Sequence, residues 1–125
     1  MTDVTFEEMN SQEQQLTGEW FGTTMAELER ARVSLQTEAD RATEDEKVNW
    51  LRQLGRVVGR ISLLQAALES MDAGTMVMAA PDDTLIAQTV DAAEKLGDAI
   101  ASAATASAVV AFVDDLFKAI DTALA

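Results

Sequence analysis

The sequence predicts an all-α fold, an antiparallel bundle of three to four helices. Helix-favouring residues such as Ala, Leu, Glu, Gln and Met are abundant, whereas the 125 residues include one Pro and six Gly. No segment has the alternation of β-branched and polar residues that is typical of a strand. Apolar residues instead recur at three- and four-residue steps over most of the chain, which indicates amphipathic helices.

The chain is long enough for one domain that buries a modest core without disulfides. We expect this helical domain to cover residues 19–125. Residues 1–18 are polar and acidic with scattered apolar side chains, so we expect an N-terminal arm that is flexible or forms a short extra helix. Trp20 and Phe21 follow this arm and are positioned to dock it on the bundle.

The first helix is expected over residues 24–42. Thr24 and Glu27 have the spacing of a capping box, in which each side chain accepts a hydrogen bond from a backbone N–H at the helix start. The apolar positions that follow form only a narrow row.

The second helix is expected over residues 44–72, with Thr43 and Glu46 as its capping box and Gly74 as its stop. Three acids in its first turn suit the positive end of the helix dipole. Its apolar residues repeat at helical spacing, with a second set widening the face to one side. The main set is Leu51, Leu54, Val58, Ile61 and Leu68, and the widening set is Trp50, Val57, Leu64 and Met71.

Neither Gly nor Pro separates these two helices, so a single helix over residues 24–72 is an alternative. The polar stretch over residues 36–47 and the second capping box favour a hairpin.

After Pro81, either Asp82 or Asp83 can cap a third helix. We expect helices over residues 83–104 and 107–124. One continuous helix of about forty residues would be roughly 60 Å long, and a compact domain favours two helices instead.

The net charge of −13 is unevenly distributed. The charge is −7 over residues 1–29, +2 over residues 30–60 and −8 over residues 61–125. Binding to a phosphate backbone requires a basic face, so we expect no direct nucleic-acid binding. The same acidity permits a basic protein partner, attracted at long range.

Histidine and cysteine are absent, which removes the usual zinc and haem sites, thiol nucleophiles and histidine acid–base chemistry. The acidic clusters are better explained as helix N-terminal residues or solvated faces than as catalytic carboxylates. No phosphate-binding loop or EF-hand spacing is present. We therefore expect a protein that is not an enzyme and that has no cofactor and no metal.

Three groups of side chains are candidates for partner binding: an aromatic cluster, a row of arginines and a methionine-rich loop. The candidate residues are Trp20, Phe21, Met25, Arg52, Arg56, Arg60, Met76 and Met78. Each group also has a structural interpretation. The aromatics would pack in the core, the arginines would pair with acids of a neighbouring helix, and the methionines would cap the bundle.

Two rows of small residues predict close helix packing. Their members are Gly55, Gly59, Ser62 and Ala66 in the second helix, and Ala99, Ala103 and Ala106 near the end of the third. A glycine inside a helix costs about 1 kcal/mol relative to alanine, so a compensating interaction is expected. We expect the rows to pack together, either within one chain or across a dimer.

The segment between Asp98 and Asp114 has fifteen residues without a charge. This length falls short of the roughly twenty apolar residues that span a bilayer, so no transmembrane segment is predicted. The acidic N-terminus does not resemble a secretory signal, which predicts a cytoplasmic protein. Export by a specialised secretion system would leave no recognisable sequence signal.

Together these features predict a non-enzymatic, acidic helical module for protein–protein interaction, such as an inhibitor, an immunity protein, a chaperone or an assembly component. We expect a protein partner and a homo-oligomer, most simply a dimer. One alternative is an inhibitor that mimics nucleic-acid charge and binds a DNA- or RNA-binding protein. Another is a membrane-active secreted helical protein.

Overall fold

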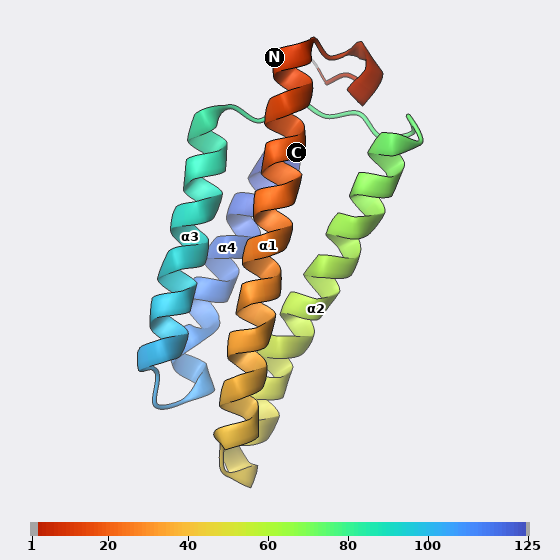
Figure 1. The fold of residues 1–125 in the computed structure, drawn as a ribbon. Coiled ribbons are helices and arrows are strands. Elements are labelled where there is room, and N and C mark those ends of the chain that lie inside the picture. The colour runs from red at the N-terminus through yellow and green to blue at the C-terminus, as the bar shows by residue number, and fades with distance from the viewer. Residues whose placement is uncertain (1–2, 125) are drawn as a thin grey trace.

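A computed structural model describes residues 3–124 and shows a bundle of four α-helices within that range (Figure 1). Successive helices run in opposite directions. The helices are α1 (Ser11–Arg41), α2 (Glu44–Asp72), α3 (Asp83–Ser102) and α4 (Val110–Leu124), and two short 3-10 helices are η1 (Phe6–Glu8) and η2 (Ala106–Val109). The predicted all-α antiparallel bundle is confirmed.

Helix α1 occupies the middle of the bundle (Figure 1). It packs against α2 on one side and against α3 on the other, and α4 packs against α3. Contacts between α2 and α4 are much sparser. Helix α2 therefore forms one edge of the molecule.

Helix α1 begins at Ser11, well before the predicted start near Thr24. Its capping box is Asn10 with Glu13: the Glu13 N–H donates to Asn10 Oδ1 over 2.8 Å, and the Asn10 N–H donates to Glu13 Oε1 over 2.9 Å. The prediction of a helix start at Thr24 was wrong, because the earlier box satisfies the first N–H groups and the helix continues through Thr24. Residues 11–18, expected in the arm, belong to α1.

The helix is interrupted at Ala42 and Thr43, between the end of α1 and the start of α2. This confirms the hairpin and excludes the single long helix. Thr43 is the N-cap of α2, but its side chain makes no capping hydrogen bond. The Glu46 carboxylate instead accepts the Ala106 N–H over 3.1 Å, so the predicted capping box is replaced by a contact with η2. At the other end Gly74 has a positive φ of 73°, a conformation that glycine adopts without strain, and the helix stops as predicted.

The predicted division of the C-terminal half into two helices is also confirmed. The Leu85 N–H donates to Asp82 Oδ1 over 2.9 Å, so Asp82 is the cap of α3. Helix α3 ends at Ser102, and residues 103–105 and η2 separate it from α4.

The core is centred on a row of buried residues along α1. They recur at three- and four-residue steps, so they lie on one side of the helix. The row consists of Thr17, Trp20, Phe21, Thr24, Leu28, Ala31, Leu35 and Ala39. Trp20 is completely buried, and its Nε1–H donates to Thr89 Oγ1 over 3.2 Å. This hydrogen bond connects α1 to α3 inside the core.

The segment before α1 is attached to the end of the bundle. Val4 and Met78 exchange two backbone hydrogen bonds of 3.1 and 3.0 Å. The backbone N–H and the hydroxyl of Thr5 donate to Glu8 Oε1 over 3.0 and 2.8 Å. The backbone hydrogen bond, followed by the hydroxyl, lowers the pKa of Glu8 below its ordinary value of 4.5.

Thr24 and Thr89 provide a matched test of the core. The Thr24 hydroxyl is buried without a hydrogen-bond partner among residues 3–124, so Thr24→Val should raise the free energy of unfolding by about 1 kcal/mol. Thr89→Val removes the acceptor of the Trp20 indole and should lower it by about 1–2 kcal/mol. Urea denaturation followed by Trp fluorescence measures both. Equal destabilisation by the two variants would contradict the conclusion that the Thr24 hydroxyl is unpaired while Thr89 accepts the Trp20 hydrogen bond.

The lowered pKa of Glu8 predicts an acid-sensitive N-terminal segment. A depressed pKa stabilises the folded form above the ordinary carboxyl pKa, and this stabilisation is lost as the pH falls through the lowered value. Hydrogen-exchange protection of the Val4 and Met78 amides should therefore fall as the pH drops below the ordinary carboxyl pKa of 4.5. In Glu8→Gln these two amides should be weakly protected at every pH. Glu7→Gln, the control at the exposed neighbouring residue, should give the same pH profile as the wild type. The same pH profile in Glu8→Gln and the wild type would refute the prediction.

Candidate protein-binding surface

Helix α2 has apolar residues on two opposite sides. One side is buried against α1 and includes Trp50, Val57, Ile61 and Leu64. On the other side Val48, Leu51, Val58 and Leu63 are between 41% and 64% exposed. A helix of a soluble protein is normally apolar on the core side only. The second apolar side of α2 is therefore a surface that residues 3–124 leave uncovered.

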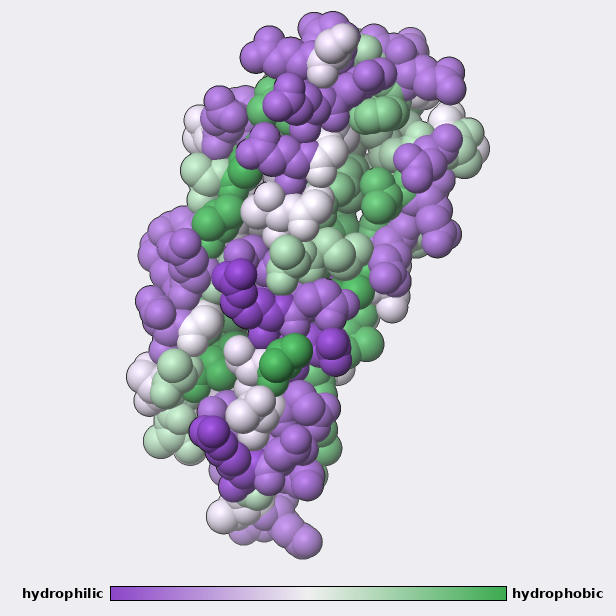
Figure 2. Space-filling view, in the orientation of Figure 1, coloured by the Kyte–Doolittle hydropathy of each residue, from purple (hydrophilic) through white to green (hydrophobic). Residues whose placement is uncertain are grey.

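We call this surface the outer face of α2. It consists of Val48, Leu51, Gly55, Val58, Gly59, Ser62 and Ala66, all exposed, with Leu63 beside them. Their helical spacing places them on one side of α2 over about 27 Å. Apolar side chains, green in Figure 2, are visible along the α2 edge of the molecule.

The outer face contains no charged residue, although the chain has a net charge of −13. Of the three arginines between Val48 and Ala66, only Arg52 is exposed beside the face, and it forms no ion pair within residues 3–124. An uncharged surface of this length on a strongly acidic protein is where a partner can approach with the smallest desolvation penalty.

Arg56 and Arg60 point toward α4 rather than toward solvent. Arg56 pairs with Asp114 and Arg60 with Asp121. Both guanidinium groups also lie over the ring of Phe117, at 5.2 and 4.4 Å from its centroid. The structural interpretation of the arginine row, pairing with acids of a neighbouring helix, is confirmed for these two residues. Their role as partner-binding candidates stays a prediction.

The predicted close packing between the two rows of small residues does not occur within the chain. Gly55 and Gly59 are exposed, and a Cβ at either position would have no neighbouring atom within 4 Å. The larger side chains on the other side of α2 bury more apolar area against α1, so the helix turns its small residues outward.

The second row lies elsewhere in the bundle. Ala99 and Ala103 are half-buried against the core and Ala106 is buried in η2. Of the three, Ala106 reaches α2, but at Glu46 rather than at the glycines.

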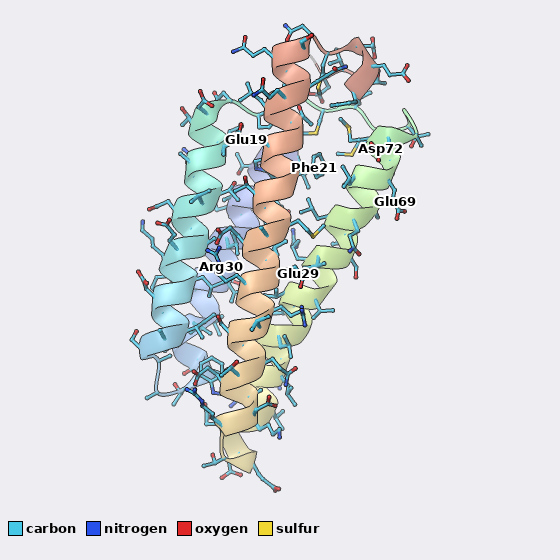
Figure 3. The ribbon with its side chains drawn as sticks, in the orientation of Figure 1. Glu19, Phe21, Glu29, Arg30, Glu69 and Asp72 are labelled. Carbon is cyan, nitrogen blue, oxygen red and sulfur yellow. The ribbon has the colours of Figure 1, made fainter. Side chains whose placement is uncertain are left out.

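The aromatic candidates are core residues. Trp20 and Phe21 are buried and pack edge to face with their ring centroids 5.0 Å apart. Phe21 points from α1 toward α2 (Figure 3), where it lines a cavity of about 170 Å³ together with Leu68 and Met71. Met25 is half-buried against the same core. The structural interpretation of this cluster, packing in the core, is what the fold shows.

The methionine loop is also largely used by the fold. Met78 is completely buried and pairs with Val4, and Met76 is half-buried against the core. Val77 between them is 53% exposed. The two methionines therefore cap the end of the bundle, as the structural alternative predicted.

Sequence reasoning misassigned the most exposed part of the outer face. It grouped Leu51 and Val58 with Ile61 as the main apolar row, whereas the structure buries Val57 and Leu64 and exposes Leu51 and Val58. The signal available in the sequence was the position of Gly55 and Gly59 beside Leu51 and Val58. A buried helix face rarely tolerates the gaps that glycines leave, so this side of the helix could have been assigned to the surface.

Within residues 3–124 no group of three or more potential ligands could hold a metal ion. No helix in that range combines the length and apolarity needed to cross a bilayer.

The helices and their packing define the class of the protein as an all-α helical bundle. In comparisons with known proteins, no family model, no curated protein and no solved structure matches this chain.

The open surroundings of the glycines lead to a stability prediction. Gly55→Ala and Gly59→Ala should each raise the free energy of unfolding by about 0.5–1 kcal/mol in dilute solution, because alanine favours the helix and meets no steric obstacle. Gly74→Ala is the matched control and should destabilise, because its φ of 73° strains any residue with a Cβ. Urea denaturation measures all three. Destabilisation by Gly59→Ala in dilute solution would show that this position is packed within the chain.

Proposed function

We propose that the protein is a non-enzymatic, acidic helical interaction module that binds a protein partner through the outer face of α2. The observation that carries the proposal is that α2 is apolar on two sides and covered on only one. A contiguous apolar helix face that stays exposed on a folded domain often marks a protein-binding site. The lack of histidine and cysteine supports a role in binding rather than in catalysis.

The chemistry of the face favours a helical ligand. Gly55 and Gly59 leave a shallow region at its centre, into which the side chains or backbone of an opposing helix can approach closely. Val48, Leu51 and Val58 then provide the apolar contact. The two glycines reduce the stability of α2 by about 1 kcal/mol each, which close approach of a partner would offset.

Charged side chains at the two ends of the outer face would orient a bound partner. Lys47 and Arg52 are exposed near its beginning, and Glu69 and Asp72 are exposed beyond its end. Figure 3 shows Glu69 on the side of α2 that points away from α1. Such charges at the rim of an apolar contact favour one orientation of the partner and disfavour the reverse. The overall acidity adds long-range attraction for a basic partner.

The proposal is tested with two valines of similar exposure on different helices. Val58 lies in the outer face and is 42% exposed, whereas Val33 lies on α1 and is 55% exposed. In affinity purification from the native source, Val58→Asp should lose the co-purifying protein because it puts a charge into the contact, and Val33→Asp should retain it. Circular dichroism checks that both variants are folded.

Retention of the partner by a folded Val58→Asp protein would remove the outer face as the binding site. Equal loss in both variants would show that the effect is not specific to α2.

A further inference from the structure

We infer that the partner of the outer face is a second copy of this chain, whose α2 lies antiparallel to the first. This inference rests on the proposed function of the outer face and names its occupant. It is carried by the shape of the face, by the charges at its two ends and by the position of α2 at the edge of the bundle.

Six of the seven residues of the outer face pair with one another about the midpoint between Val58 and Gly59. A two-fold axis at this midpoint makes each residue face the one equally far on the other side. The resulting pairs are Val58 with Gly59, Gly55 with Ser62, Leu51 with Ala66 and Val48 with Glu69, each across the two copies. The first three pairs thus place residues of the outer face on one copy opposite residues of the same face on the other, as a closed two-fold dimer requires.

The same arrangement sets large side chains against small ones. Val58 is level with Gly59 of the second copy and Leu51 with Ala66, so these two large side chains are opposite residues that leave room for them. A parallel, in-register pair would instead place Leu51 against Leu51 and Gly55 against Gly55. It would combine crowded positions with empty ones, and the helices could not approach closely along the whole face.

The charges at the two ends of the face favour the same orientation. Lys47 is exposed at one end, Glu69 is exposed at the other, and neither forms an ion pair within residues 3–124. Antiparallel α2 helices bring Lys47 next to Glu69 of the second copy, twice per dimer. Parallel helices would bring like charges together at both ends.

The position of α2 leaves this face accessible. The helix forms one edge of the bundle, and α1 covers it from the opposite side (Figure 1). A contact made by one helix from each copy lies at the small end of stable interfaces, so we expect micromolar association. Because each copy has a net charge of −13, added salt should strengthen the dimer by screening the repulsion. A complex with a basic protein would weaken instead.

Disulfide trapping tests the orientation directly, because the chain has no cysteine of its own. Under mild oxidation Val58→Cys should cross-link to itself, because it lies beside the two-fold axis. Leu51→Cys alone should not, because the two thiols would be about 22 Å apart along the helices, far beyond disulfide reach. A mixture of Leu51→Cys and Ala66→Cys should give the mixed dimer. Val33→Cys on α1 is the control for random collision.

Sedimentation equilibrium tests the association itself, at low and high salt. The wild type should be a monomer–dimer mixture whose dissociation constant falls as salt rises. Gly59→Leu should raise that constant at least about tenfold by filling the space at the axis, while the monomer keeps its helical circular dichroism.

Self-cross-linking of Leu51→Cys would overturn the antiparallel arrangement. A wild type that stays monomeric at high concentration and high salt, with no cross-linking of Val58→Cys, would overturn the second copy as the partner. The proposed function would still stand in that case if Val58→Asp, but not Val33→Asp, lost a different protein from the native source. If neither variant changed what co-purifies, the proposed function would fail as well.

Discussion

The buried row along α1 holds the molecule together, because both α2 and α3 pack against it. Its largest member, Trp20, is completely buried, and its indole N–H donates a hydrogen bond to Thr89 of α3. Helices α2 and α4 approach each other much less closely along their lengths. Because α1 lies between α2 and α3, α2 is at an edge of the bundle, and this placement leaves its outer face exposed.

Helix α2 is fixed from two directions by different chemistry. Apolar side chains attach it to α1, whereas α4 reaches it through Arg56 and Arg60 over the ring of Phe117. Backbone contacts between these two helices are sparse, and the long arginine side chains extend across to α4. Arg56 and Arg60 are thus paired within the chain, and the outer face keeps Val48, Leu51 and Val58 beside two glycines. On an acidic protein this uncharged face is the surface best suited to association.

Local sequence signals determined most of the helix positions. The stop at Gly74 and the cap at Asp82 depend on interactions among residues close in sequence. The hairpin between α1 and α2 lies where the sequence placed it, although the capping box that favoured it is not formed. The start of α1 was missed for a reason of the same kind. Asn10 with Glu13 and Thr24 with Glu27 have the same capping spacing, and a helix that starts at the first pair simply continues through the second.

By itself, the sequence determined that α2 has two apolar rows, a row of arginines and a row of small residues. Only the tertiary structure decided which of these faces inward. Burial of Trp50, Val57 and Leu64 against α1 removes more apolar area from water than burial of Leu51 and Val58 beside glycines would. That choice rotates the helix, directs Arg56 and Arg60 to α4 and leaves the outer face open. Periodicity describes each row, but the neighbouring helix selects between them.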